Sequence, residues 1–150
     1  MVESGEFQMF MGEYQHNLDT KGRIIIPAKF RDGLGDEMVV TRWLDGCLAI
    51  YTEKQWQELY QKLQTLPSTK REARRFTHMI MAKAAECTLD AQGRIRLPQP
   101  LVKEAQLVKE CVVIGVSDHV EIWDQERWNE YYAIASESFE DIAEELTEFF

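Results

Sequence analysis

The chain has 150 residues, of which 26 are acidic and 17 are basic, and its formal net charge is −9 with a pI of about 4.9. A hydrophobic content of 45 % and an aromatic content of 11 % exclude a disordered chain. The length allows one ordinary domain or two very small ones with a shared core. The overall acidity argues against a protein that coats nucleic acid through bulk positive charge.

The sequence carries no signal for a membrane or an oxidising compartment. No stretch approaches the roughly 20 apolar residues that span a bilayer, and residues 1–6 lack the basic start and apolar run of a secretory signal. Cys47, Cys87 and Cys111 are an odd number in apolar surroundings, which predicts buried free thiols. We therefore expect a cytoplasmic protein with no membrane partner.

An internal repeat is the most informative feature. Residues 18–27 read LDTKGRIIIP and residues 89–98 read LDAQGRIRLP, so six of ten positions are identical at an offset of 71. The match continues at an offset of 72, where Trp56 falls on Trp128 and Tyr60 falls on Tyr132. Two copies at this period predict a tandem duplication and not a solenoid.

The first copy begins with a predicted hairpin. Residues 13–18 alternate in part and residues 23–26 are β-branched and apolar, so both are expected to be strands that pair with each other. Between them, Asp19 can bond the backbone ahead of it and Gly22 permits a positive φ. Residues 19–22 therefore predict the turn.

A short helix and a second hairpin complete the copy. Pro27 suits the start of a helix over residues 28–31, which Gly33 and Gly35 end. The Asp-Gly dipeptide at 45–46 is a strong hairpin signal. The expected strands of the second hairpins are 37–42 and 47–51 in the first copy, and 111–116 and 120–123 in the second.

Amphipathic helices follow both copies. Thr52 and Gln55 form a capping box, Ser68 or Thr69 is expected to cap the next helix, and Asp124 caps a longer one. The apolar residues at helical spacing are Trp56, Leu59, Tyr60, Leu63 and Leu66, then Ala73, Phe76, Met79 and Ile80, then Trp128, Tyr131, Tyr132, Ala135, Phe139, Ile142, Leu146 and Phe149 or Phe150. We interpret these stripes as core packing, and docking of the last stripe on a neighbouring subunit stays open.

A copy of about 45 residues buries too little apolar surface to be stable alone. We therefore expect the copies to pack as a pseudo-twofold pair around one mixed β core. The predicted fold class is α+β. The expected divisions are repeat 1 at 13–55, linker helices at 56–83, repeat 2 at 84–127 and an acidic C-terminal helix at 128–150.

The doubled motif LDxxGRIxxP resembles the SpoVT-AbrB family of swapped-hairpin DNA-binding domains. Two copies in one chain of this length are similar to the MraZ family of bacterial transcriptional regulators, as are MFMGEY at 9–14 and ECTLD at 86–90. The resemblance covers residues 9–146, and deletion of residues 1–8 is expected to leave fold and binding unchanged.

The resemblance implies tandem SpoVT-AbrB repeats, each a swapped-hairpin-like β-barrel, with flanking helices. It also implies a ring-shaped homo-oligomer that is associated with the nucleoid. Such a protein binds double-stranded DNA at direct repeats upstream of the division and cell-wall gene cluster. The family typically represses that cluster, its own gene included.

The tip of the first hairpin is the main candidate for DNA contact. Lys21 and Arg23 project from a short turn, with Lys29 and Arg31 close behind, and arginine offers paired donors to guanine or phosphate. An ion pair between Asp19 and Arg23 that only locks the turn is the structural alternative. Both roles can coexist, and the resemblance favours DNA contact for Arg23.

The second tip is expected on the same face, by pseudo-symmetry. It is less basic, because Gln92 replaces the lysine, and we expect its structural role to be larger. The predicted DNA-contacting residues are Arg23, Lys21, Arg94, Lys29, Arg31 and Arg96, and the predicted turn-positioning residues are Asp19, Gly22, Asp90 and Gly93.

Other charged and reactive residues carry weaker signals. The basic run Lys70, Arg71, Arg74 and Arg75 predicts a solvated helix face, with phosphate contact or an inter-subunit ion pair as alternatives. The three histidines share no motif and show no metal-ligand spacing with cysteine. No P-loop or GxGxxG occurs, so we predict no catalytic residue, no metal and no cofactor.

Two functions stay open on these grounds. The first is a DNA-binding transcriptional regulator, and the alternative is a non-catalytic protein-interaction or antitoxin-like module on the same fold. The negative charge is concentrated in residues 137–150, which hold six acidic residues and no basic one. For a DNA-binding protein, this acidic segment is expected to lie on a face turned away from the DNA.

Overall fold

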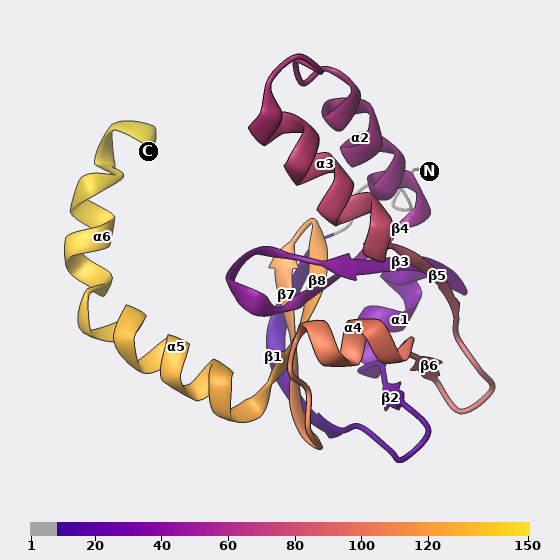
Figure 1. The fold of residues 1–150 in the computed structure, drawn as a ribbon. Coiled ribbons are helices and arrows are strands. Elements are labelled where there is room, and N and C mark those ends of the chain that lie inside the picture. The colour runs from indigo at the N-terminus through magenta and orange to yellow at the C-terminus, as the bar shows by residue number, and fades with distance from the viewer. Residues whose placement is uncertain (1–8) are drawn as a thin grey trace, which may run out of the picture.

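The computed structural model describes residues 9–150, and the expectation for residues 1–8 lies outside that range. Figure 1 shows a central sheet from which two helical projections extend. The elements in chain order are β1 (Phe10–Asn17), β2 (Arg23–Ile25), α1 (Ala28–Leu34), β3 (Glu37–Arg42), η2 (Leu44–Gly46), β4 (Leu48–Thr52), α2 (Glu53–Gln64), α3 (Arg71–Lys83), β5 (Ala85–Thr88), β6 (Arg94–Arg96), α4 (Gln99–Glu104), β7 (Glu110–Ser117), β8 (His119–Asp124), α5 (Gln125–Glu137), α6 (Phe139–Glu145) and η3 (Thr147–Phe149).

The strands form one six-stranded sheet in the order β1-β7-β8-β4-β3-β5 and a two-stranded ribbon of β2 and β6. When each strand is exchanged for its equivalent in the other copy, the order of the large sheet reverses onto itself, with β8 and β4 at the centre. The two copies are therefore related by a pseudo-twofold axis. Every strand pair is antiparallel.

The predicted hairpin of residues 13–18 and 23–26 is wrong in its pairing. β1 pairs with β7 and β2 pairs with β6, so both strands find their partners in the second copy. The turn itself forms as predicted, because the Asp19 N–H donates to the Arg23 carbonyl at 2.9 Å and the Gly22 N–H donates to the Asp19 carbonyl at 3.1 Å. The exchange brings Ile24 and Ile95 together at the pseudo-twofold axis, and each is only 1 % exposed.

One core serves both copies. Ile26 and Phe30 of the first copy and their equivalents Leu97 and Leu101 of the second are all buried in it. The three cysteines are buried free thiols, as predicted. Burial raises the pKa of Cys87 and of Cys111 to about 11, so both thiols stay protonated at neutral pH.

Most of the predicted second hairpins and caps are confirmed. β3 pairs with β4, and β7 pairs with β8. The Thr52 hydroxyl accepts from the Gln55 N–H at 3.0 Å, and the Asp124 carboxylate accepts from the Arg127 N–H at 3.3 Å. These caps fix the directions in which α2 and α5 leave the sheet.

Two helix boundaries differ from the predictions. α1 continues through Gly33 and ends at Leu34, because Gly35, with a φ of 79°, is the residue that leaves the helical conformation. α3 begins after Lys70, so neither Ser68 nor Thr69 caps it.

The interpretation of the last aromatic stripe as core packing is wrong. The helix that Asp124 caps ends at Glu137, and neither α5 nor α6 contains a buried residue. Trp128 packs on Trp123 with 5.0 Å between ring centroids, but Phe139 is 69 % exposed and Phe149 is 75 % exposed. Helical periodicity identifies an apolar face, and it does not say whether the same chain covers that face.

None of the helices within residues 9–150 has the length and apolar character that a membrane span requires.

Candidate nucleic-acid interface

The ribbon of β2 and β6 places three arginines on one face. Arg23 lies opposite Arg96, Ile24 opposite Ile95, and Ile25 opposite Arg94. Ile24 and Ile95 point into the core, and side chains alternate along a strand, so the other side chains of the ribbon point outward. The outer face therefore carries Arg23, Arg94 and Arg96 together with Ile25.

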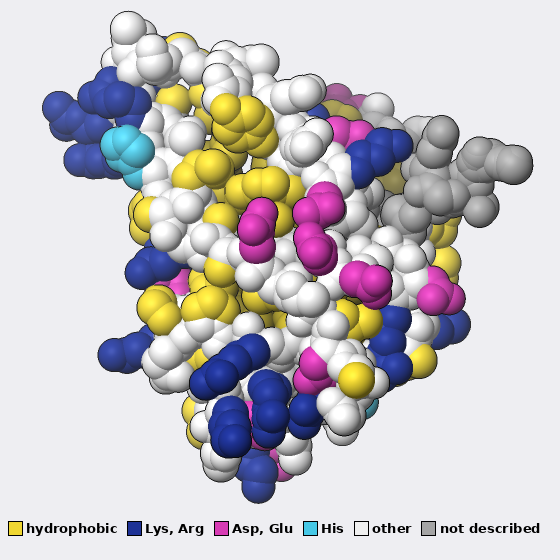
Figure 2. Space-filling view, turned by 90° about the vertical axis from the view of Figure 1, so that its right-hand side faces the viewer, with side chains coloured by type: hydrophobic (Ala, Val, Ile, Leu, Met, Phe, Trp, Pro, Cys, Tyr) yellow, Lys and Arg dark blue, Asp and Glu magenta, His cyan; other side chains and the backbone are white. Residues whose placement is uncertain are grey.

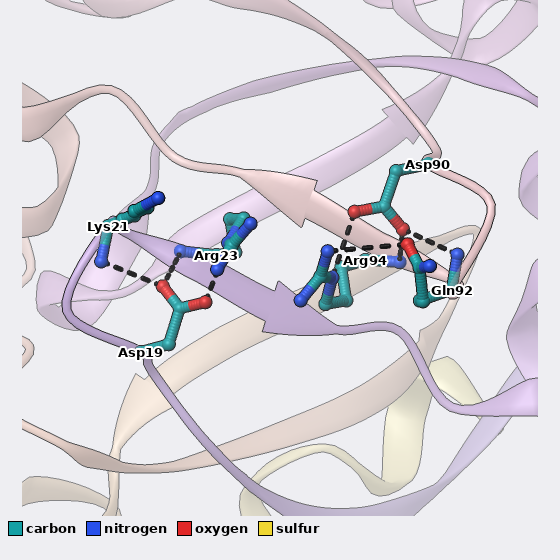
Figure 3. Close-up of polar contacts among 6 residues, drawn as sticks. All are labelled: Asp19, Lys21, Arg23, Asp90, Gln92 and Arg94. Carbon is teal, nitrogen blue, oxygen red and sulfur yellow. Dashed lines mark hydrogen bonds and ion pairs between the residues drawn. The ribbon is translucent and has the colours of Figure 1, made fainter.

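Arg23 is held by a carboxylate of its own loop, as Figure 3 shows. Asp19 Oδ1 accepts from the main-chain N–H groups of Lys21 at 2.9 Å and of Arg23 at 2.8 Å. Asp19 Oδ2 accepts from Arg23 Nε at 2.6 Å. The ion pair expected as the structural alternative is therefore present. It engages Nε, and about a third of the Arg23 side chain is exposed.

The second loop repeats this arrangement (Figure 3). Asp90 accepts from the N–H groups of Gln92 at 2.9 Å and of Arg94 at 2.8 Å, and also from Arg94 Nε at 2.8 Å. Arg94 Nη2 additionally donates to Gln92 Oε1 at 3.3 Å, so one of its terminal nitrogens has a partner within the loop. Arg23 consequently has more free donor capacity than Arg94.

The two loop carboxylates are strongly acidic. The main-chain N–H of Arg23, with further bonds from its side chain and from the Lys21 N–H, lowers the pKa of Asp19 to about 2. The main-chain N–H of Arg94 lowers the pKa of Asp90 in the same way. Both carboxylates are ionised at neutral pH, so each loop keeps its arginine in a fixed position before any ligand arrives.

Two glycines tie each loop to the opposite copy. Gly22 has a φ of 81° and Gly93 a φ of 78°, a region that side-chain-bearing residues rarely adopt. The Gly22 carbonyl accepts from the Leu97 N–H at 2.7 Å, and the Gly93 carbonyl accepts from the Ile26 N–H at 2.9 Å. The predicted turn-positioning residues thus hold the loops against the ribbon as well as shaping them.

Arg31 and Lys29 differ from each other in their surroundings. Arg31 is half-buried, donates from Nε to the Ile26 carbonyl at 2.8 Å, and lies over Gly93. This contact gives Arg31 a structural role that the sequence analysis missed, because the glycine it covers belongs to the other copy. Lys29 is exposed on α1.

Lys21 and Arg96 meet at the edge of the ribbon. A shallow depression there is lined by Lys21, Arg96, Leu97, Pro98 and Gln99. Among residues 9–150, neither Lys21 nor Arg96 forms an ion pair. In Figure 2, Lys and Arg side chains gather at the lower end of the molecule, at the level of β2 and β6. The acidic α6 lies at the opposite side of the fold in Figure 1.

A second polar cluster lies on the other face of the large sheet. His119 Nδ1 is 2.7 Å from Asp118 Oδ1, and His119 Nε2 is 2.8 Å from Glu121 Oε2. Trp123 Nε1 donates to Glu121 Oε1 at 2.9 Å, and Tyr51 of the first copy stacks on the imidazole. Within the part of the chain that the structure describes, no group of three or more histidine, cysteine or acidic residues is arranged to hold a metal ion.

A protein-family model described as "MraZ protein, putative antitoxin-like" matches the chain twice, over residues 9–79 and over residues 80–150. The chain belongs to the MraZ family. MraZ is a regulator-like family and not a family of enzymes. Each MraZ match contains one of the two Asp–Arg loops, and α2 of the first match corresponds to α5 of the second. The tandem resemblance inferred from the doubled motif is confirmed.

Proposed function

We propose that this chain is a sequence-specific DNA-binding transcriptional regulator that contacts DNA through the β2–β6 ribbon. The observation that carries this proposal is the outward face of the ribbon, where Arg23, Arg94 and Arg96 stand side by side. Lys21 lies at its edge, and Lys29 is a candidate for flanking phosphate contact. Arg31 contributes mainly by holding the Gly93 loop.

The shape and charge of the ribbon suit a duplex. A two-stranded β-ribbon fits the major groove of B-DNA, where arginine can donate to guanine O6 and N7. The fixed carboxylates of Asp19 and Asp90 reduce the conformational freedom that the arginines lose on binding. The net charge of −9 does not oppose this arrangement, because the acidic segment of residues 137–150 lies on the far side of the fold.

One ribbon offers few base contacts, so useful affinity requires several. We propose a ring-shaped homo-oligomer whose ribbons engage successive direct repeats upstream of its own gene, in the division and cell-wall cluster. Linked sites then bind with a high effective concentration. Occupancy of that region by the oligomer represses the cluster and places the protein at the nucleoid.

The test is a binding series with duplexes taken from the DNA immediately upstream of the gene. The duplexes carry one, two or three of the repeats, and a shuffled duplex of equal length is the control. We expect affinity to rise steeply with the number of repeats and to fall steeply with salt, because phosphate contacts release counterions. Affinity that ignores both repeat number and salt would overturn the proposal.

An antitoxin-like module is the second candidate function. The description of the matching family favours it, as does the exposed apolar and acidic face of α5 and α6, which suits a protein partner. The two candidates make different predictions for the gene neighbourhood. Evenly spaced direct repeats upstream of the gene support the regulator, and an adjacent toxin gene supports the antitoxin.

A further inference from the structure

The two strands of the β2–β6 ribbon differ at one outward position, and this difference breaks the pseudo-twofold symmetry of the candidate interface. Arg23 and Arg94 are equivalent in the two copies, whereas Ile25 stands where the second copy has Arg96. Ile25 is 37 % exposed and lies on the same face as the three arginines. The outer face of the ribbon therefore carries three arginines and one isoleucine where a symmetric ribbon would carry four arginines.

One end of the ribbon is strongly basic. Arg23 lies opposite Arg96 there, and Lys21 lines the shallow depression beside Arg96. Figure 3 shows Lys21 and Arg23 together on the first strand and its loop. Three cationic side chains at this end suit phosphate oxygens or the acceptor atoms of guanine.

The other end combines an apolar and a basic side chain. Ile25 lies directly opposite Arg94, and Gln92 replaces the lysine of the first loop. The Cβ atoms of directly opposite residues are about 4.5–5.5 Å apart, and successive base pairs of DNA are about 3.4 Å apart. Ile25 and Arg94 can therefore reach the same base pair or two adjacent ones.

An apolar side chain among arginines has a specific partner in the major groove of DNA. Thymine presents its C5-methyl group there and makes apolar contacts with protein side chains, whereas guanine presents acceptors for arginine. A single exposed isoleucine is ordinary on a protein surface. Ile25 differs from such a residue because it lies on the face that the proposed function turns toward DNA.

We propose that Ile25 is a specificity-determining residue that packs on a thymine C5-methyl group, within one base pair of the base pair that Arg94 faces. The inference rests on the proposed DNA-binding function and adds to it the base that one side chain reads. It also gives the ribbon a direction, because a twofold-symmetric surface matches a palindromic site. A ribbon with unequal ends suits direct repeats, which have a direction themselves.

The test exchanges thymine for 2′-deoxyuridine, one position of the repeat at a time, in a three-repeat duplex from the DNA upstream of the gene. This exchange removes the C5-methyl group and keeps the hydrogen-bonding groups of the base. Fluorescence anisotropy measures the affinity. Burial of one methyl group changes affinity about fourfold, so the wild type is expected to bind about fourfold more weakly for each repeat substituted at the sensitive thymine.

Variants of Ile25 show whether this side chain reads the methyl group. Ile25→Ala removes the apolar contact and is expected to bind the thymine and uracil duplexes with equal affinity. Ile25→Leu keeps an apolar side chain of the same volume and is expected to keep the preference for thymine. Val108→Ala, at a position that is 81 % exposed and outside the ribbon, is the matched control for truncation of an apolar side chain and keeps the wild-type preference.

Two results would overturn the inference. The first is a wild type that binds the thymine and uracil duplexes equally at every position, and a repeat without thymine has the same meaning. The second is an Ile25→Ala variant that keeps the preference for thymine. The wild-type scan requires no change in the protein, so its outcome does not depend on how well a variant folds.

Failure of this inference is distinguishable from failure of the proposed function. If the wild type binds with steep dependence on repeat number and salt but ignores the methyl group, the proposed function stands and the role of Ile25 is wrong. If affinity ignores repeat number, salt and the methyl group alike, the proposed function fails and the role of Ile25 fails with it.

Discussion

Arg23 and Arg96 lie directly opposite each other on the β2–β6 ribbon, although they belong to different copies of the repeat. Like charges in this position destabilise a strand pair. Asp19 offsets part of the repulsion on the Arg23 side, and Arg96 has no such partner among residues 9–150. The arrangement concentrates positive charge at a cost in stability, which a polyanion bound to this face would offset.

Replacement of Arg23 by alanine tests the main contact. Arg23→Ala is expected to abolish specific DNA binding, since one base-reading arginine contributes about 1–3 kcal/mol and the loss repeats in every subunit of an oligomer. Fluorescence anisotropy with a multi-repeat duplex measures the effect. Arg94→Ala is the matched comparison and is expected to be milder, because Arg94 Nη2 already donates to Gln92. Normal binding by Arg23→Ala would show that its role is confined to the turn.

Arg96→Thr should have opposite effects on stability and on binding. Removal of the repulsion with Arg23 is expected to stabilise the free protein by about 0.2–1 kcal/mol, as for other cross-strand pairs. Removal of an exposed cation is expected to weaken DNA binding and to reduce its salt dependence. Urea unfolding and binding at several salt concentrations measure the two effects. A variant that is less stable than the wild type contradicts this account of the pair.

Asp19→Asn should reveal a pH-dependent contribution to folding. The folded protein lowers the pKa of Asp19 from 3.8 to about 2, so the ionised form stabilises the fold above the ordinary pKa. This contribution is lost as the pH falls from about 4 through about 2. We expect wild type and Asp19→Asn to differ most at neutral pH and to converge in acid, as measured by denaturant unfolding. Asp32→Asn, at an exposed position of α1, is the matched control for the loss of one negative charge outside the loop.

His119 gives the opposite pH dependence. Burial alone would lower its pKa, but hydrogen bonds to Glu121 and Asp118 outweigh burial and raise the pKa above 6.5. The stabilisation is therefore complete below pH 6.5 and is lost as the pH rises through the raised value. The difference in unfolding free energy between wild type and His119→Gln should shrink from pH 6 to pH 9. Parallel stability curves for the two proteins would exclude a raised pKa.

Local signals in the sequence predicted part of the local structure, although the helix stop at Gly33 and the cap at Ser68 or Thr69 were wrong. The caps at Thr52 and Asp124 form as expected, because each depends on side chains within three residues. The Asp19–Arg23 pair follows from the same kind of short-range geometry. These short-range contacts do not depend on which strands pair with each other.

The pairing of the strands could not be predicted in this way. A turn at residues 19–22 is compatible with a hairpin and with an exchange of strands between copies. Long-range contacts such as the pairing of Ile24 with Ile95 distinguish the two arrangements. The roles of Arg31 over Gly93 and of Tyr51 on His119 were missed for the same reason. Each of these contacts joins two copies that the sequence separates by about 70 residues.

The pairing of β1 with β7 and of β2 with β6 also determines the order of folding events during synthesis. β1 is among the first elements to leave the ribosome, yet its sheet partner is β7, and Phe10 pairs with Ser117. Such distant pairings must wait for most of the chain, and they slow folding. Until β7 emerges, the edge of β1 and the apolar side chains of the first copy stay open to other nascent chains. This fold is therefore most prone to exchange its halves between molecules while neighbouring chains are still being synthesised.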